Sequence, residues 1–321
     1  MPWIIGIDEA GYGPNLGPFV MSAVACLVPT ALSDHELWDV LSDCVRRADD
    51  ANDDRLLIAD SKVVYSPARG LADLEMGALV LLGAGSTESP DCVAGYLGCV
   101  CPDASHELKD EQWYLGDSAV PLCADASCIS THIDRIRKSS QQHGLLWGSV
   151  QSAICCPPAF NALLDRWDTK GAVLMSGLAV LVRQILSAVS YSDSLHFYVD
   201  KHGGRNYYAA TLQHALPGAM ILARQESAGC SSYSALGLNR ECSFTFQPRA
   251  DADHFCVAAA SMLSKYLREL LMNEFNRFWR NHVPGLKPTA GYPGDAARFI
   301  KDIKPALRRL GMSETELWRR K

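Results

Sequence analysis

The strongest constraint on this chain is an apolar run near its start that ends in two adjacent acids. Residues 3–8 form a short run rich in isoleucine, which ends at Asp8 and is followed directly by Glu9. A cluster of Gly, Pro and Asn comes next, and residues 18–28 are again apolar. We therefore expect two strands joined by a glycine-rich turn, with the acids at the end of the first strand.

Strands and helices are mixed along the rest of the chain. Further strands are predicted at residues 145–154, 196–199 and 219–222, and residues 226–247 are polar and β-leaning. Helices are predicted at residues 67–82, 158–167, 171–189, 206–215 and 251–280, with one or two amphipathic helices in residues 294–321. Two adjacent strands followed by strands that helices separate favour an α/β layer fold with a central mixed sheet.

The length and composition allow one large domain or two small ones. Hydrophobic residues make up 48% of the 321 residues and charged residues 21%, which is an ordinary globular balance. No apolar run reaches the roughly 18 residues that a bilayer crossing requires, and the start lacks the basic segment of a signal peptide. We therefore expect a cytoplasmic protein without a membrane partner.

The 12 cysteines are expected to be reduced thiols, because disulfides are rare in proteins that are not exported. The densest group comprises Cys92, Cys99, Cys101, Cys123 and Cys128. Its spacing does not give the paired ligands of a typical structural zinc site. Zinc is therefore the less favoured alternative.

The net charge of −6 is unusual for a protein that binds nucleic acid. Such proteins are often basic, because neutralising phosphates drives much of their affinity. The negative charge counts mildly against that partner. It does not exclude a nuclease, whose metal-binding carboxylates themselves add negative charge.

The acid pair suits a hard cation. Burying two carboxylates at a strand end is unfavourable unless a cation or hydrogen bonds offset their charge. Mg²⁺ prefers carboxylate oxygens together with substrate phosphates, and Gly11 and Gly13 would let main-chain N–H groups approach a phosphate. Taken alone, however, the pair is better explained as a solvated strand end before a turn.

Three other polar sites have the same ambiguity. Asp60-Ser61-Lys62 offers a hydroxyl and an ammonium to a phosphate, but it also fits a solvated turn. Asp200 ends a predicted strand and is followed by a glycine- and arginine-containing segment. Asp251 and Asp253 open a long helix, where either one also suits the helix dipole as an N-cap.

Four segments, in order, resemble motifs of the type 2 ribonucleases H (ribonuclease HII). Residues 6–14, Gly-Ile-Asp-Glu-Ala-Gly-Tyr-Gly-Pro, with Gly17-Pro18 after them, resemble the opening signature of that family. Asp60-Ser61-Lys62 resembles its Asp-Ser-Lys motif, residues 258–265 resemble its Ala-Ala-Ala-Ser-Ile-Leu-Ala-Lys helix, and residues 291–293 resemble its Gly-Tyr-Pro segment. The chain is thus similar to a divergent member of that family.

The resemblance implies a ribonuclease H-like fold, in which a central mixed β-sheet is flanked by helices and the C-terminal part is helical. It implies a single catalytic domain over residues 1–321, with insertions at about 83–142 and 224–248. The first region has Gly, Ser, Pro and Cys scattered without a sustained period, and the second accounts for the 51 positions between Asp200 and Asp251. We expect a monomer.

The resemblance also assigns a site, residue by residue. Two ions of Mg²⁺ or Mn²⁺ would be held by the catalytic carboxylates of Asp8, Glu9, Asp200 and Asp251, with Asp253 as the alternative to Asp251. Substrate would be bound by Gly11, Tyr12, Gly13, Ser61, Lys62 and Tyr292. Tyr12 stands where the family has Arg and Gly294 where it has Thr, and the first departure bears on the preference for a ribonucleotide junction more than on the chemistry.

The implied activity is endonucleolytic hydrolysis of the RNA strand of RNA/DNA hybrids, or of DNA at embedded ribonucleotides, by two-metal-ion catalysis. The alternative is a non-catalytic nucleic-acid-binding relic of the same fold, which should have lost carboxylates. A nucleotide-binding phosphotransferase is disfavoured, because the glycine-rich segment lacks the Gly-Lys-Ser/Thr of a P-loop.

Local basic side chains would have to bind nucleic acid in a chain of negative net charge. The candidates are Lys62, Lys201, Arg205, Lys265 and Arg268, together with the C-terminal Arg308, Arg309, Arg319, Arg320 and Lys321. The C-terminal group is equally well explained as the solvated face of a helix. His202 and His254 are expected near the site, where a structural role is favoured for each.

Overall fold

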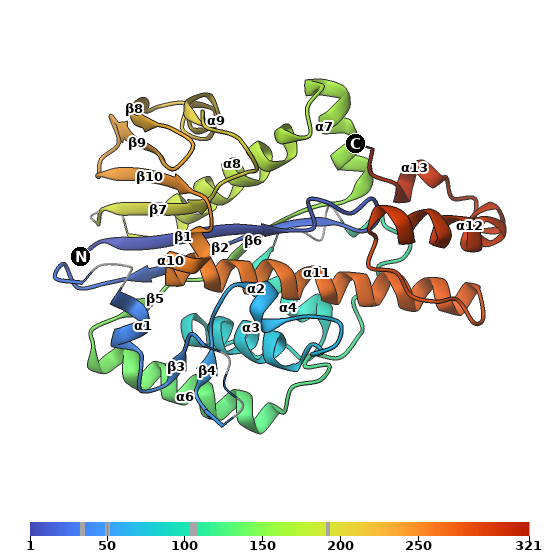
Figure 1. Cartoon of the computed structure of the whole chain (residues 1–321), viewed down its shortest axis with the longest axis horizontal. Coiled ribbons are helices and arrows are strands. Elements are labelled where there is room, and N and C mark those ends of the chain that lie inside the picture. Colours follow the sequence, from blue (N-terminus) through green and yellow to red (C-terminus); the bar gives the residue numbers. More distant parts are fainter. Residues whose placement is uncertain (33–35, 49, 51, 103–107, 191–192, 321) are drawn as a thin grey trace.

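The computed structural model describes the chain except for residues 33–35, 49, 51, 103–107, 191–192 and 321. In this described part, an eight-stranded sheet has the order β5-β2-β1-β7-β10-β9-β8, and β6 also pairs with β2 (Figure 1). Its strands are β1 (Trp3–Ala10), β2 (Phe19–Leu27), β5 (Leu146–Trp147), β6 (Gln151–Cys155), β7 (Leu195–Asp200), β8 (Met220–Glu226), β9 (Ser231–Leu236) and β10 (Cys242–Gln247). A separate parallel pair joins β3 (Val45–Arg46) and β4 (Leu56–Leu57).

The strand β1 lies inside the sheet, with a partner on each side. It runs antiparallel to β2, where Asp8 pairs with Ser22. It runs parallel to β7, where Ile7 pairs with Val199. β10 is also parallel to β7, and the other strand pairs of this eight-stranded sheet are antiparallel. Because β1 and β7 run in the same direction, their carboxyl ends lie at one edge of the sheet and bring Asp8 near Asp200.

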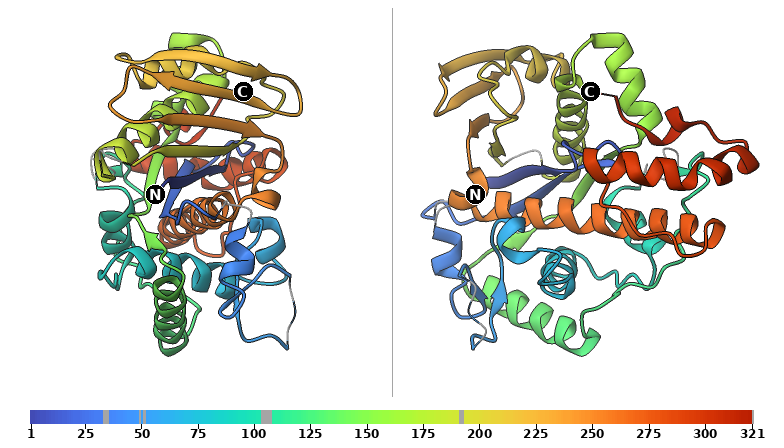
Figure 2. Two further views of the ribbon diagram at one scale, coloured as in Figure 1. Left: turned by 90° about the vertical axis from the view of Figure 1, so that its left-hand side faces the viewer. Right: turned by 45° about the vertical axis from the view of Figure 1, so that its right-hand side comes forward.

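Helices cover both faces of the sheet, as Figures 1 and 2 show. On one face α11 (Phe255–His282) packs against β1 and β2, α3 (Ala72–Gly85) packs on α11, and α6 (Ala126–Gln142) packs on α3. On the other face α8 (Gly171–Ala188) packs against β2 and β6, with α7 (Pro157–Trp167) and α9 (Ala209–Ala215) beside it. The other helices are α1 (Leu37–Val40), α2 (Ser61–Val64), α4 (Val93–Val100), α10 (Ala250–Asp253), α12 (Pro293–Leu310) and α13 (Glu314–Leu317). The predicted α/β architecture, with a mixed sheet between helices and a helical C-terminal part, is confirmed.

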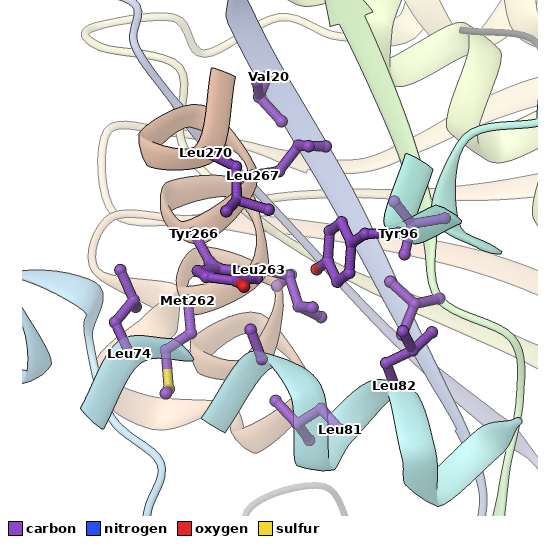
Figure 3. Close-up of a cluster of buried hydrophobic side chains, with 14 of the residues drawn as sticks. Val20, Leu74, Leu81, Leu82, Tyr96, Met262, Leu263, Tyr266, Leu267 and Leu270 are labelled. Atoms are coloured by element: carbon purple, nitrogen blue, oxygen red, sulfur yellow. The ribbon is translucent and has the colours of Figure 1, made fainter. Parts of the chain in front are cut away.

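The alternation of side chains along β1 supplies two separate cores. Ile4 belongs to the hydrophobic cluster on the α11 side, whereas Ile5 and Ile7 belong to the cluster on the α8 side. Apolar residues on both faces of a strand are expected where helices cover both faces. Figure 3 shows part of the first cluster, with Met262, Leu263, Tyr266, Leu267 and Leu270 of α11 next to Leu74, Leu81 and Leu82 of α3, Tyr96 of α4 and Val20 of β2.

Gly6 allows α11 to cross directly over β1. A Cβ atom at Gly6 would lie 2.0 Å from the carbonyl carbon of Cys256 and 2.2 Å from the nitrogen of Val257. Any side chain here would therefore hold the helix away from the strand. The close crossing lets Ser264 of α11 donate a 2.9 Å hydrogen bond to the main-chain oxygen of Asp8.

The two regions expected as insertions contain regular elements. Residues 83–142 include α4 and the 17-residue helix α6, although no sustained period was expected there. Residues 224–248 include β9 and β10, and β10 pairs directly with β7 in the central sheet. The helix expected at 251–280 is divided at His254 into α10 and α11. Because β10 pairs with β7, residues 224–248 extend the central sheet beside the strand that carries Asp200.

One described helix, α8, is long and apolar enough to cross a membrane by length and composition alone, with a mean hydropathy of 1.6 over Gly171–Ala188. This differs from the expectation that no segment would reach that length. Half of that window is buried, and Leu178, Val182 and Ile185 belong to the core on this face of the sheet. Core helices of globular proteins meet the same criterion, so the feature is weak evidence for a membrane span.

Candidate active site

Asp8 and Glu9 lie where β1 reaches the edge of the sheet. Asp8 is 7% exposed, and its Oδ1 atom accepts a 2.7 Å hydrogen bond from the main-chain N–H of Glu9. Ser264 holds the main chain of Asp8 from the α11 side. The first acid is therefore fixed between a strand and a helix, which are rigid supports for a site.

The end of β7 and the turn after β10 bring two further acids to the same edge. Asp200 closes β7, and its Oδ1 atom accepts a 2.9 Å hydrogen bond from the N–H of Ala250. Arg249, in the left-handed conformation with φ 58°, turns the chain from β10 into α10. Asp251 follows in α10 and is buried. The bond to Ala250 thus ties the strand end to the short helix that carries Asp251.

All four predicted metal ligands line one cavity of about 260 Å³. Its wall consists of Asp8, Glu9, Asp60, Ser61, Lys62, Asp200, Arg249, Asp251, Ala252 and Ser261. The predicted phosphate-binding residues Ser61 and Lys62 are therefore in the same cavity as the acids. Asp253, the alternative to Asp251, is exposed, lies outside this wall, and accepts a hydrogen bond from Gln247.

Asp60 is a further acid of the cavity that the sequence analysis did not single out. It caps α2, where its Oδ1 atom accepts a 2.9 Å hydrogen bond from the N–H of Lys62. It also lies close enough to Asp251 to raise the pKa of that group. The signal was present, because Asp60 opens the motif from which only Ser61 and Lys62 were selected. A 3.0 Å hydrogen bond from Ser261 to Ser61 joins this motif to α11.

The four predicted metal ligands hold their protons more tightly than ordinary carboxyl groups. Burial raises the pKa of Asp8 well above its usual range, and repulsion from Glu9 and Asp200 raises it further. Burial and then Asp200 raise the pKa of Glu9 to about 7. Burial and then Asp60 raise the pKa of Asp251 to about 6, and burial raises that of Asp200. Such shifts are expected where buried carboxylates share a low-dielectric site and repel one another.

Lys62 contributes positive charge to the wall of the cavity. Asp60 is the main cause of the raised pKa of Lys62, and Asp251, Asp8 and Asp200 raise it further against the effect of burial. The ammonium is therefore within electrostatic reach of four acids and remains protonated at neutral pH.

The donor set suits hard divalent cations, although the acids as placed do not form a metal centre. Within the described residues, no three His, Cys, Asp or Glu side chains are close enough together to hold one ion. The Oε2 atom of Glu9 is nevertheless buried without a hydrogen-bond partner. Mg²⁺ and Mn²⁺ prefer carboxylate oxygens. The residues therefore fit these ions, provided that the side chains turn toward them.

His202 lies next to Glu9, close to the site as expected. Its Nε2 atom is 4.0 Å from Oε2 of Glu9, and neither atom has a hydrogen-bond partner among the residues that the structure describes. Burial and then the charge of Arg205 lower the pKa of His202 to about 3. The ring is therefore neutral and adds no positive charge to the cavity. The second predicted histidine, His254, stacks on Tyr198 with ring centroids 4.1 Å apart.

Residues 11–17, here called the glycine loop, connect β1 to β2 next to the acids. Gly11 has φ +85°, and a Cβ atom there would lie 2.4 Å from Nε of Arg268. Tyr12 packs edge-on against Phe19, with ring centroids 6.4 Å apart. The ammonium of Lys170 lies 4.6 Å from the centre of the Tyr12 ring. Tyr12 is thus in contact with a lysine from another segment of the chain.

Tyr292 lies beside Gly13 of the glycine loop. A Cβ atom on Gly13 would lie 3.8 Å from the Tyr292 ring, which is 54% exposed. The main-chain oxygen of Gly291 accepts hydrogen bonds from the N–H groups of Asn15 and Leu16, at 2.7 and 3.2 Å. These bonds fix Tyr292 relative to the loop.

The predicted basic residues differ in their access to a ligand. Lys201 is buried, and its ammonium donates to main-chain and amide oxygens. Arg268 is also buried and donates to main-chain oxygens, while Lys265 pairs with a neighbouring glutamate at 2.5 Å. Arg319 is also buried, so it does not lie on the solvated helix face that was the alternative explanation for the C-terminal basic group. Lys321 lies outside the described residues.

Comparison with known proteins gives matches among solved structures. No family model and no curated protein matches this chain. A ribonuclease H2 from Pyrococcus horikoshii OT3 matches at 14% identity with a TM-score of 0.46, over 98% of this chain and 92% of that chain. The ribonuclease HII of Archaeoglobus fulgidus, solved in complex with PCNA, matches at 14% identity with a TM-score of 0.44, over the same shares of the two chains.

A third solved structure is that of a Bst ribonuclease HIII in complex with Mn²⁺. It matches at 12% identity with a TM-score of 0.43, over 99% of this chain and 65% of that chain. All three structures are those of ribonucleases H.

Proposed function

We propose that this protein is a metal-dependent ribonuclease H, an endonuclease that hydrolyses the RNA strand of RNA/DNA hybrids or cuts DNA at embedded ribonucleotides. The observation that carries the proposal is the convergence of Asp8, Glu9, Asp200 and Asp251 on one cavity. These acids come from β1, β7 and α10, which are far apart in the sequence. Buried acids that share a cavity and have raised pKa values are typical of a site that binds cations.

The four acids would hold two Mg²⁺ or Mn²⁺ ions, with Asp60 as a neighbouring source of oxygen. Bound divalent ions activate an attacking water and stabilise the departing oxygen in phosphodiester hydrolysis. The chain itself holds Asp8 between β1 and α11, and it holds Asp200 against Ala250. Burial is the main cause of the raised pKa of Asp8, and repulsion from Glu9 and Asp200 raises it further. Ion binding would relieve that repulsion.

The groups around the cavity suit a nucleic-acid backbone. Lys62 and Ser61 lie in its wall, where an ammonium and a hydroxyl would bind a phosphate. The exposed ring of Tyr292 would stack on a sugar or base of the substrate. The glycine loop, with Gly11, Tyr12 and Gly13, would meet the 2′-hydroxyl, which is the group that separates RNA from DNA.

The first test is cleavage of two labelled substrates by the wild type and by Asp8→Asn, with Mg²⁺ or Mn²⁺. One substrate is an RNA/DNA hybrid and the other is a DNA duplex that carries a single ribonucleotide. We expect metal-dependent cutting by the wild type and none by the variant. Asp8→Asn should keep the fold, because a neutral amide removes repulsion among buried acids. The ratio of the two wild-type rates identifies the preferred substrate.

Thermal unfolding with the ions alone provides a readout that needs no substrate. An ion at 100 times its dissociation constant adds about 2.7 kcal/mol to the stability of the folded state. Mg²⁺ or Mn²⁺ should therefore raise the melting temperature of the wild type but not that of Asp8→Asn. A folded wild type that neither gains stability from either ion nor cleaves either substrate contradicts the proposal.

A non-catalytic nucleic-acid-binding relic is the second candidate, and one observation favours it. Within the described residues, no three acids are close enough as placed to hold an ion. A relic would bind the hybrid without cutting it, and neither the ions nor Asp8→Asn would change that affinity. The retention of four acids on one cavity weighs against it.

We also propose a monomeric, cytoplasmic protein that acts without a membrane partner. These three properties stay predictions from the sequence.

A further inference from the structure

A buried arginine from the C-terminal segment lies against the glycine loop. Arg319 is 1% exposed. Its Nη1 atom donates a 2.7 Å hydrogen bond to the main-chain oxygen of Gly11, and its Nη2 atom donates a 2.6 Å bond to that of Pro14. One guanidinium therefore holds the glycine loop at two points, three residues apart.

The main chain around Arg319 reinforces this contact. The N–H of Arg319 donates to the oxygen of Asn15 at 2.7 Å, and the side-chain amide of Asn15 donates to the oxygen of Arg319 at 2.9 Å. Trp318 forms an antiparallel bridge with Leu16. Asn161 of α7 in turn donates to the oxygen of Trp318 at 2.8 Å. The C-terminal segment is thus held between α7 and the glycine loop.

The positive charge of Arg319 has no acidic partner in the described part of the chain. The guanidinium packs over the ring of Phe160 at 5.0 Å, and burial with repulsion from Arg268 lowers the pKa of Arg319 to about 9. Arg268 is also buried, and it donates to the main-chain oxygens of Leu16 and Ala290. Burying a cation without a counter-ion is costly. Arg268 has Oε1 of Glu269 3.9 Å from its Nη1 atom, so the uncompensated charge is that of Arg319, and a positive charge buried beside the loop favours an anion there.

The contact also sets the direction of the loop's N–H groups. In a planar trans peptide the C=O and N–H bonds point in opposite directions. Because the C=O of Gly11 points to Arg319, the N–H of Tyr12 points away from it. Among the described residues, no main-chain oxygen accepts a hydrogen bond from the N–H of Tyr12 or of Gly13, and Gly13 is exposed. These two donors are therefore available to a ligand.

We propose that Arg319 is a positioning residue for substrate, which fixes the glycine loop so that the N–H groups of Tyr12 and Gly13 bind the ribose or phosphate of the cut strand. This inference rests on the proposed nuclease function. Arg319 itself does not touch substrate. It acts through the carbonyls of Gly11 and Pro14 and through its charge beneath the loop.

The experiment compares Arg319→Ala and Arg319→Lys with a matched control, Arg240→Ala. Arg240 also donates to main-chain oxygens, those of Leu186 and Ser190 at 2.7 and 2.6 Å. It lies near Cys242, at the end of β10 that is far from Asp200. Steady-state kinetics are measured on the duplex with one ribonucleotide, and melting temperatures are measured for each variant.

We expect Arg319→Ala to lower kcat/KM by about tenfold to a hundredfold, mostly through a higher KM, because two charge-assisted hydrogen bonds that order the binding loop are lost. Arg319→Lys should recover part of the loss, since it keeps the positive charge and N–H donors but lacks the planar fork that reaches both carbonyl groups. Millimolar guanidinium chloride should partly rescue Arg319→Ala. Arg240→Ala should have wild-type kinetics even where its melting temperature falls.

Two results would overturn the inference while leaving the nuclease in place. One is wild-type kcat/KM for Arg319→Ala. The other is a loss in both alanine variants that follows only their melting temperatures and that guanidinium does not rescue. If the wild type does not cleave, the proposed function has failed, and affinity for the uncut duplex decides the inference. Weaker binding by Arg319→Ala than by the wild type and Arg240→Ala would then support it, and equal binding, or no binding by the wild type, would overturn it.

Discussion

Replacing Gly6 with alanine would place a methyl group against the main chain of α11. The added carbon would lie 2.0 Å from the carbonyl carbon of Cys256, whereas real Cβ atoms essentially never come within 3.0 Å of another heavy atom. The nearest atoms belong to the main chain of Cys256 and Val257, which cannot turn away as a side chain could. The helix must therefore move away from β1 by about 1 Å or more. Overpacking in a core costs roughly 1–3 kcal/mol. Since both contacts here are backbone, we expect Gly6→Ala to lose at least about 3 kcal/mol of unfolding free energy.

The same displacement would also reach the site. Ser264 would move away from the main-chain oxygen of Asp8, to which it donates a hydrogen bond. Ser261, which bonds Ser61, lies one turn earlier on the same helix. We therefore expect Gly6→Ala to cleave more slowly than the wild type even under conditions in which the variant is fully folded.

Gly98→Ala is the matched control, because Gly98 is an exposed residue of α4 with no heavy atom within 4 Å of a Cβ atom. This substitution should raise the unfolding free energy by about 0.5–1 kcal/mol through helix propensity alone. The assay is urea-induced unfolding followed by circular dichroism, with a chelator present throughout. A Gly6→Ala protein within about 1 kcal/mol of the wild type would refute the reasoning, because α11 would then not cross β1 at this distance.

Two further predictions concern single carboxyl groups. Loss of a residue that bonds to a metal ligand lowers activity roughly 10- to 100-fold, and Asp251→Asn, which removes a proposed ligand itself, should lower the cleavage rate by more than that. Asp253→Asn, at an exposed position, should keep the wild-type rate. Equal cleavage rates for the two variants would contradict the assignment of Asp251. Burial raises the pKa of Glu111 to about 7 from 4.5, although Trp113 donates a 2.6 Å hydrogen bond to it. Because a raised folded-state pKa makes the ionised form unfavourable, the wild type should lose stability as the pH rises from about 4.5 to 7, and Glu111→Gln should be spared that loss. Urea unfolding with a chelator should show the variant gaining about 2–3 kcal/mol relative to the wild type over this range, and a difference that does not vary with pH would exclude the shift.

Local patterns in the sequence predicted boundaries of strands and helices at three of the candidate acids, but it was the resemblance to ribonuclease HII motifs that assigned these acids to one site. Asp8 and Asp200 close apolar runs, and the parallel pairing of β1 with β7 places both at one edge of the sheet. Asp251 lies in the first turn of α10, and the resemblance placed it by its distance from the Ala-Ala-Ala-Ser motif. Asp60 could have been selected on the same grounds, because it both caps a helix and is the first residue of the Asp-Ser-Lys motif.

Features that depend on distant contacts could not be predicted in the same way. Arg319 bonds to Gly11 across 308 positions, and an arginine in a basic, amphipathic segment is locally indistinguishable from one on a solvated face. The helix α6 was missed for another reason. Its apolar face consists of little more than Ile129, Ile133 and Ile136 among polar residues, which gives a weak helical period. The place of β10 beside β7 depends on pairing that residues 242–247 alone do not specify.

The position of β1 inside the sheet has a consequence for how the protein is made. Its first partner, β2, follows within a few residues, but β7 and α11 begin at Leu195 and Phe255. Contacts between segments this far apart in the sequence slow folding. During synthesis one edge of β1 therefore stays unpaired until β7 has left the ribosome, and an open, apolar edge is where growing chains associate with one another. The chain is thus expected to depend on chaperones, or on slow synthesis, at the stage when only its first two strands have paired.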